Sequence, residues 1–304
     1  MHNQVWLNRV RVMRCGVVVA NCGWLIYSVR TMGSTSEQIM VAAVQLSTQA
    51  DVGQNLAVAR SRVLEAAGQG AKLVVLPEDL ACMGAEERKR EIAEELAPGS
   101  MVFDQLSAMA ADAGVWLIAG GIPERSADSR RPYNACAVFG PDGLLVGRYR
   151  KIHLFDADLA GGDRLMESRG CQAGDSPCCV DVGGICVGLS ICYDLRFPEL
   201  YRRLVDMGAM VVVVPAAFTV VTGKDHWEVL LRARAIENQV YVVAAGQYGV
   251  HPYRSTFGRS MVVDPWGLVV SQCSDGVGVC YHRLDMARVR EVRRQMPVLR
   301  HRRL

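Results

Sequence analysis

The chain has 304 residues, of which 50% are hydrophobic and 21% charged, and a formal net charge of +3. This composition is typical of a globular protein with enough apolar material for a large core. It does not indicate a nucleic-acid-binding protein, because Lys and Arg form no stripe along the chain. We interpret the one basic run, residues 293–304, as a solvated tail rather than a binding patch.

The N-terminal segment differs in character from the remainder. Residues 1–38 contain several arginines but no acidic residue before Glu37, and their apolar stretch, residues 16–27, is too short to span a bilayer. We therefore expect no membrane anchor. Residues 1–38 fit an Arg-rich mitochondrial transit segment, a secretory signal, or a leader that is absent when translation starts at an internal methionine. We expect a cytoplasmic protein, or a mitochondrial one if the transit segment is real.

The cysteines predict neither a disulfide framework nor a metal site. There are eleven, an odd number, and they lie scattered within apolar runs without any C-x-x-C pair. No histidine lies near them at the spacing of a zinc site. We expect reduced thiols and no metal or organic cofactor.

The first half of the main segment alternates strand and helix patterns. Apolar runs at 40–46, 72–79 and 115–122 predict buried strands. Helical spacing between them predicts helices over the following ranges: 55–71, 86–96 and 100–114. Such alternation is typical of a layered α/β domain.

The second half begins with two predicted hairpins. Asp142-Gly143 and Gly183-Gly184 each separate two strand-like runs, which is the sequence signature of a tight hairpin turn. A helix over 199–208 and a nearly all-valine strand over 209–217 follow.

Next, the sequence predicts a long helix over 225–239. We expect Asp225 to be its N-cap and Glu228 and Arg232 to form an i,i+4 ion pair. Further strands are predicted within 240–285. No linker or repeat interrupts residues 39–304, so we expect one domain with two packed sheets and helices outside them.

Three ionisable residues follow strand-like runs, and together they could perform nucleophilic chemistry. Cys192 could attack an acyl carbon, with Glu78 as the base and Lys151 as the donor that stabilises the oxyanion. The backbone N–H of Tyr193 could supply a second oxyanion donor. From these residues alone, a buried core thiol and two solvated strand ends explain the pattern as well.

The segments around these residues favour the catalytic interpretation. "LVVLPE", "GRYRKIHLFD" and "GLSICYDLRFPELYR", in this order, resemble the motifs of the nitrilase superfamily of carbon–nitrogen hydrolases, and the resemblance covers about residues 40–304. It implies a Glu–Lys–Cys triad on Glu78, Lys151 and Cys192, with a second glutamate at Glu167. It also implies a single-domain, four-layer α-β-β-α sandwich that forms a homodimer or larger homo-oligomer and needs no cofactor.

The later segments resemble one branch of that superfamily. "HWEVLLRARAIE" and "MVVDPWG" are similar to the Nit subgroup of amidases, and more to deaminated glutathione amidases than to ω-amidases. The branch implies a small amide substrate, hydrolysed through a thioester to 2-oxoglutarate and cysteinylglycine. Since such a substrate is anionic, Arg196 and Arg254 are candidate carboxylate ligands, and Phe218 is a candidate pocket wall. Residues 156–179 depart from the family pattern in composition.

Other functions stay open at this point. An ω-amidase would act on 2-oxoglutaramate or 2-oxosuccinamate, and a true nitrilase would release ammonia from simple nitriles. A catalytically silent chain of the same fold could act as an oligomeric binding protein, although the intact Glu–Lys–Cys set argues against this.

Overall fold

The computed structural model describes residues 37–158 and 164–303. The predicted N-terminal extension therefore lies almost wholly outside the described residues, and the first strand begins at Gln38. Within the described part of the chain, no helix is long and apolar enough to cross a membrane.

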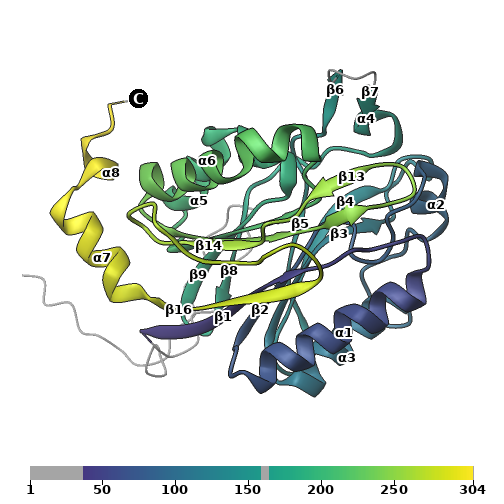
Figure 1. Cartoon of the computed structure of the whole chain (residues 1–304), viewed down its shortest axis with the longest axis horizontal. Coiled ribbons are helices and arrows are strands. Elements are labelled where there is room, and N and C mark those ends of the chain that lie inside the picture. The colour runs from purple at the N-terminus through teal and green to yellow at the C-terminus, as the bar shows by residue number, and fades with distance from the viewer. Residues whose placement is uncertain (1–36, 159–163, 304) are drawn as a thin grey trace, which may run out of the picture. The chain divides into compact units, whose positions relative to one another are not determined.

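Two six-stranded sheets pack face to face (Figure 1). The first has the order β16-β1-β2-β3-β4-β5. β1 runs parallel to β2 and β2 parallel to β3, while the other neighbours are antiparallel. Its strands are β1 (Gln38–Gln45), β2 (Leu73–Leu76), β3 (Trp116–Glu124), β4 (Tyr133–Phe139), β5 (Leu145–Arg150) and β16 (Gly278–Asp285).

The second sheet has the order β15-β14-β11-β10-β9-β8, with parallel pairing only among β9, β10 and β11. Its strands are β8 (Cys178–Val182), β9 (Ile185–Leu189), β10 (Val211–Ala216), β11 (Tyr241–Gly246), β14 (Met261–Val263) and β15 (Val269–Gln272). Two short hairpins stand apart from both sheets: β6 (Asp156–Asp158) with β7 (Arg164–Met166), and β12 (Tyr248–Val250) with β13 (Ser255–Phe257).

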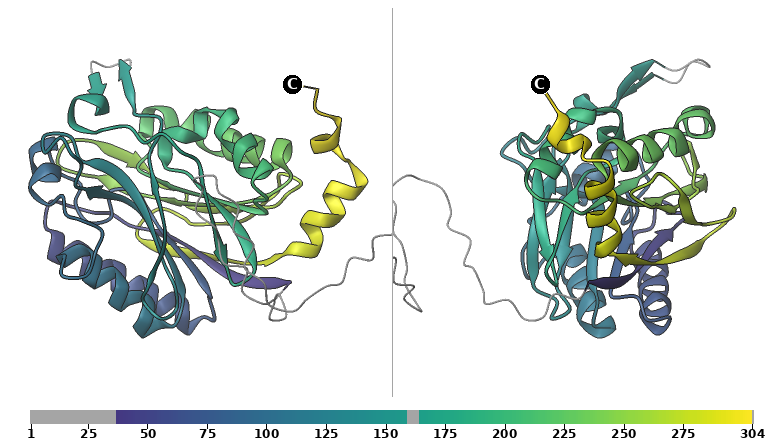
Figure 2. Two further views of the ribbon diagram at one scale, coloured as in Figure 1. Left: turned by 180° about the vertical axis from the view of Figure 1, so that it is seen from behind. Right: turned by 90° about the vertical axis from the view of Figure 1, so that its left-hand side faces the viewer.

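Helices cover the outer face of each sheet (Figures 1 and 2). α1 (Val52–Gly68) and α3 (Met101–Ala113) pack on the first sheet, and α5 (Pro198–Asp206) and α6 (Val220–Asn238) pack on the second. The remaining helical segments are short or C-terminal: α2 (Glu86–Glu91), α4 (Glu167–Gly170), the 3-10 helix η1 (Cys192–Arg196), α7 (Met286–Gln295) and α8 (Val298–His301). The predicted four-layer α-β-β-α sandwich is confirmed.

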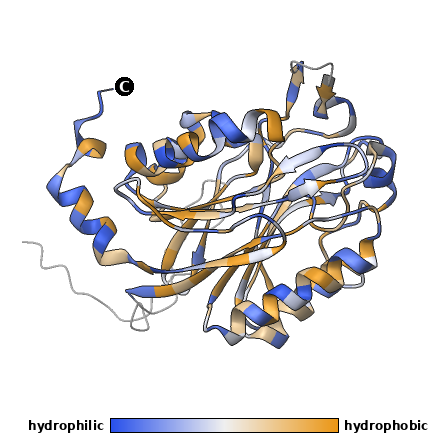
Figure 3. Ribbon diagram, in the orientation of Figure 1, coloured by the Kyte–Doolittle hydropathy of each residue, from blue (hydrophilic) through white to orange (hydrophobic). Residues whose placement is uncertain are grey.

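Alternation along the strands divides the interior into two clusters. In β1, Val41 and Ala43 face the cluster between the sheets, whereas Ala42 and Val44 face the cluster beneath α1 and α3. Figure 3 shows the resulting apolar strands between helices that carry both apolar and polar residues. Because both faces of the central strands are buried, the ends of these strands hold a rigid position.

Several local predictions are confirmed. Asp142-Gly143 joins β4 to β5, and Gly183-Gly184 joins β8 to β9. Glu228 and Arg232 form the expected pair, at 3.5 Å.

The predicted start of the long helix is wrong. α6 begins at Val220 with Thr219 as its N-cap, so Asp225 lies inside the helix. Two valines and Gly223 disfavour a helix in isolation, but tertiary packing overrides that preference. Gly223 packs so closely that an added Cβ would lie 2.4 Å from the Phe257 Cβ.

Candidate active site

The structure brings Glu78, Lys151 and Cys192 together where the two sheets meet. Glu78 follows β2 and Lys151 follows β5 of the first sheet, while Cys192 follows β9 of the second and opens η1. All three side chains are buried and line one cavity. Lys151 Nζ donates to Glu78 Oε1 at 3.0 Å. The backbone N–H of Ala217, just after β10, donates to Glu78 Oε2 at 2.9 Å and so joins this carboxylate to the second sheet.

Glu167 lies in the same cluster. This residue begins α4. Its Oε2 accepts a hydrogen bond from Lys151 Nζ at 2.8 Å and another from the Phe155 N–H at 2.7 Å. Burial acts to raise the pKa of Glu167, but the charge of Lys151 and these hydrogen bonds outweigh it and hold the pKa at about 2. Burial opposes the charge on Lys151 as well, yet the two carboxylates raise its pKa well above the usual value. The site therefore holds an ionised Glu167 carboxylate and a charged lysine.

Asn134, near the start of β4, is a site residue that sequence reasoning missed. Its amide nitrogen donates to Glu78 Oε1 at 2.9 Å and to Glu167 Oε1 at 3.0 Å, so it bridges the two carboxylates. Its own carbonyl oxygen is buried without a hydrogen-bond partner in the described structure. A lone polar residue in the apolar strand "YNACAVF" is the only signal that the sequence offers for this role.

Cys192 has a strained backbone, with φ of 46°, in the left-handed region that residues other than glycine rarely adopt. The turn that holds it is tied by Asp194, whose Oδ2 accepts the N–H of Ile191 at 2.9 Å. Burial and the negative charge of Glu78 raise the pKa of the Cys192 thiol well above its usual value, against the opposing charge of Lys151. The resting Cys192 side chain is therefore a protonated thiol, which would need a base to act as a nucleophile.

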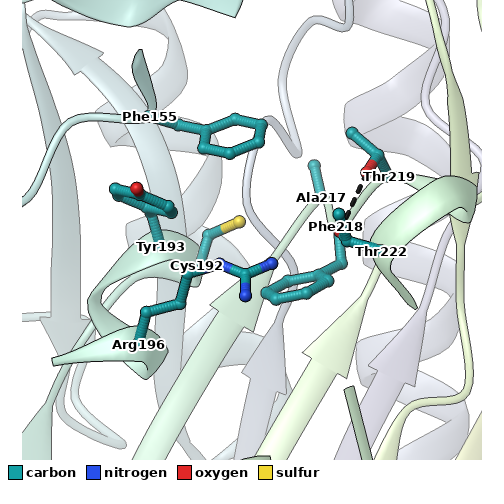
Figure 4. A pocket seen from close by; sticks show the side chains of 8 residues that line it. All are labelled: Phe155, Cys192, Tyr193, Arg196, Ala217, Phe218, Thr219 and Thr222. Atoms are coloured by element: carbon teal, nitrogen blue, oxygen red, sulfur yellow. Dashed lines mark hydrogen bonds between the residues drawn. The ribbon is translucent and has the colours of Figure 1, made fainter. Parts of the chain in front are cut away.

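A small aromatic recess opens on one side of Cys192 (Figure 4). The rings of Phe155 and Tyr193 lie with centroids 4.8 Å apart on one wall. The guanidinium of Arg196 lies 5.1 Å from the Phe218 ring on the other wall, and its Nη1 lies 3.2 Å from His226 Nδ1. Arg196 forms no ion pair within the described ranges, so the recess has an uncompensated positive charge. We name this site the aromatic recess.

A cavity of about 390 Å³ adjoins the recess and shares Phe155, Cys192 and Ala217 with it. Its volume lies within the roughly 300–1,000 Å³ range of small-molecule sites. Arg254, the third predicted substrate ligand, lines it together with Lys89, Arg169 and Asp79. Arg196 and Phe218 thus line the aromatic recess and Arg254 lines the cavity, so the three candidates lie in two adjoining hollows that both include the thiol.

In the described part of the chain, no group of three or more His, Cys, Asp or Glu residues is arranged to hold a metal ion. Apart from Cys171, the cysteines in the described ranges are free thiols.

The sequence model of the carbon–nitrogen hydrolase family matches residues 40–294. The chain belongs to this family. It is a hydrolase of carbon–nitrogen bonds other than peptide bonds, which agrees with a buried thiol beside a carboxylate and a lysine.

Among individual proteins, the chain is similar to amidases of known name and to solved structures of the same superfamily. The deaminated glutathione amidase of Bos taurus is 42% identical over 90% of this chain and 86% of its own length. An omega-amidase of Pongo abelii is 41% identical over 86% of this chain and 94% of its own length. Among solved structures, Saccharomyces cerevisiae Nit3, a member of branch 10 of the nitrilase superfamily, has a TM-score of 0.79 and 32% identity, covering 90% of this chain and 100% of that one.

Proposed function

We propose that this chain is an amidase that hydrolyses deaminated glutathione to 2-oxoglutarate and cysteinylglycine through a thioester on Cys192. The observation that carries the proposal is the Lys151 ammonium held by both Glu78 and Glu167 in the cavity that Cys192 lines. The similarity to deaminated glutathione amidases over most of the chain supports the choice of substrate.

In the first half of the reaction, Glu78 takes the proton of the Cys192 thiol as sulfur attacks the amide carbon. The oxyanion accepts hydrogen bonds from Lys151 Nζ and from the N–H of Tyr193, which has no other acceptor in the described structure. Glu78 then gives the proton to the departing nitrogen, the C–N bond breaks, and the acyl group remains on sulfur.

In the second half, Glu78 takes a proton from water as the water attacks the thioester. The C–S bond breaks and the thiol is restored with that proton. Glu167 keeps Lys151 charged and in place throughout, since its pKa of about 2 leaves it ionised at neutral pH. Asn134 positions both carboxylates, and no step needs a metal or organic cofactor.

Comparing kcat/KM for deaminated glutathione and 2-oxoglutaramate tests the substrate. We expect deaminated glutathione to be preferred and Cys192→Ala to abolish its hydrolysis. Cys273→Ala is a matched control, because Cys273 and Cys192 are both 7% exposed and Cys273 lies outside the cavity. A large preference for 2-oxoglutaramate would make the chain an ω-amidase instead. Unchanged hydrolysis by Cys192→Ala would remove the thiol mechanism.

We also propose that the chain forms a homodimer or larger homo-oligomer. Val229 and Ile236 on the outer side of α6, and Leu268 after β14, are exposed apolar side chains of the kind that such an interface covers. Light scattering of the purified protein tests this, with Val229→Asp expected to shift the mass toward the monomer. A monomeric mass for the unmodified chain would contradict it.

Residues 1–38 are further proposed to be a leader outside the catalytic domain of 39–304, in a cytoplasmic protein or, if the leader is a transit segment, a mitochondrial one. The mass of the native N-terminus tests this proposal, since an uncleaved chain starting at Met1 in the mature protein would contradict it.

A further inference from the structure

The 390 Å³ cavity contains two separate groups of charges. One is the cluster of Glu78, Lys151 and Glu167 described above. In the other, Asp79 accepts Arg254 Nη2 at 2.7 Å through Oδ2 and pairs with Lys89 at 3.1 Å through Oδ1. The Asp79 carboxylate thus contacts both cations.

The guanidinium of Arg254 is fixed on one side and open on another. Nη2 is bound to Asp79, and Nε donates to Met83 Sδ at 3.3 Å. Nη1 has no acceptor within the described ranges, and the side chain is 23% exposed where it lines the cavity. A guanidinium held in this way is oriented before a ligand arrives, and guanidinium is the group best suited to carboxylate binding. Arg169, also on the cavity wall, is exposed and forms no ion pair with any described residue.

The position of Glu78 decides which half of an amide faces Arg254. Glu78 must deliver a proton to the departing nitrogen, so that nitrogen has to lie on the Glu78 side of Cys192. Glu78 lines the cavity and not the aromatic recess. The amine half of the substrate therefore extends into the cavity on the Glu78 side, where Arg254 is bound to the neighbouring Asp79 and Arg169 also lines the wall. The aromatic recess has a volume of only about 10 Å³, room for about one water, so the acyl half lies in the cavity as well.

We propose that Arg254, oriented by Asp79 and assisted by Arg169, binds a carboxylate on the leaving amine, so that the enzyme selects amides whose amine half is anionic. This rests on the proposed function, because it takes Glu78 as the acid that protonates the amine. Cysteinylglycine carries such a carboxylate. Ammonia, the leaving group of 2-oxoglutaramate, has none and is too small to reach Arg254.

The test compares deaminated glutathione with its C-terminal carboxamide, which keeps the acyl half and removes only the carboxylate. We expect the unmodified enzyme to prefer the acid in kcat/KM by roughly 10- to 100-fold, the size of a lost charge-assisted hydrogen bond. Arg254→Met should bring this ratio close to one, and Arg254→Lys should restore part of it. The ratio cancels any general loss that a freed Asp79 causes through its neighbour Glu78.

Arg60→Met is the control, since Arg60 is an ion-paired arginine on α1 away from the cavity and should leave the ratio unchanged. Calorimetry with Cys192→Ala measures the dissociation constants of the acid and the carboxamide without turnover, so it tests the carboxylate site even if the hydrolysis proposed above is not observed. Equal binding of the two ligands, or no binding of the acid, would overturn the proposal. So would an Arg254→Met enzyme that keeps the preference of the unmodified chain.

Discussion

Tyr149 Oη donates a hydrogen bond of 2.7 Å to Asp194 Oδ2, and this buried contact joins the two sheets at the active site. Tyr149 lies in β5, two residues before Lys151, and Asp194 lies two residues after Cys192. Asp194 also accepts the N–H of His153 at 3.1 Å through Oδ1. The bond therefore sets how the lysine of one sheet lies relative to the thiol of the other.

We expect Tyr149→Phe to weaken both stability and turnover. The change keeps the ring but leaves a buried carboxylate without one donor, which costs about 1–3 kcal/mol in the free energy of unfolding. Because the Lys151–Cys192 geometry relaxes, kcat should fall as well. Urea denaturation and steady-state kinetics measure the two effects.

Tyr201→Phe is a matched control for this experiment. Tyr201 is equally buried, but its hydroxyl bonds the neutral Ser190 hydroxyl at 3.0 Å, so the loss of stability should be smaller. Equal losses in the two variants would show that the charge of Asp194 is not what makes the Tyr149 contact valuable.

Glu78→Gln should make the Cys192 thiol easier to deprotonate while it abolishes turnover. The negative charge of Glu78 adds to burial in raising the pKa of Cys192, so its removal should lower that pKa. Alkylation of Cys192 by iodoacetamide, followed against pH by mass spectrometry of its peptide, should show a midpoint at lower pH than in the unmodified protein. Amide hydrolysis should nevertheless be lost, because no base or acid remains. A midpoint that stays or moves to higher pH would contradict the assigned charge of Glu78.

Sequence patterns identified most of the architecture because the signals for it are local. A nearly all-valine run predicts β10, and the Asp142-Gly143 turn predicts the β4–β5 hairpin, since each depends on neighbouring residues alone. Glu78, Lys151 and Cys192 were predicted from the residues that flank them, and the structure places all three in one cavity. The start of α6 at Val220 was not predicted, because packing against β13 determines where this helix begins.

Contacts between distant segments could not be predicted, because they do not depend on neighbouring residues. Asn134 reaches Glu78 across separate strands, and Asp79 pairs with Arg254 from the far end of the chain. No periodicity or spacing encodes such pairs, which follow from the register of the sheet and the packing of the layers. Arg254 could be named as a candidate ligand from its type, but its role in the cavity depends on Asp79.

Glu167→Gln should make stability less sensitive to acid. The pKa of Glu167 falls from the usual 4.5 to about 2 in the folded chain, so its contribution to stability is complete above its unfolded pKa and is lost as pH falls toward the folded value. At pH 7 the variant should be less stable than the unmodified protein, and the gap should narrow between about pH 5 and 2. Urea denaturation across this range measures the gap. Glu87→Gln, at an exposed ion pair on α2, should show almost no gap at any pH.

Gly121→Ala should damage the active site through backbone packing alone. Gly121 has φ of +66°, and an added Cβ would lie 2.4 Å from the Asp79 nitrogen and 2.6 Å from the Glu78 Cα. Neither backbone atom can move without carrying Glu78 away from Lys151 and Cys192, and a displacement of about 1 Å in a catalytic group costs on the order of 100-fold in rate. We expect kcat/KM to fall by that order, with a loss of about 1–3 kcal/mol in the free energy of unfolding from the strained φ.

Gly68→Ala supplies the comparison for this substitution. Gly68 ends α1, has no positive φ, and an added Cβ there meets nothing within 4 Å. The variant should keep its activity and be at least as stable as the unmodified chain, because alanine favours the helix. If Gly121→Ala behaved like Gly68→Ala, with turnover near that of the unmodified enzyme, the close packing of β3 against the Glu78 backbone could not be what holds this carboxylate in position.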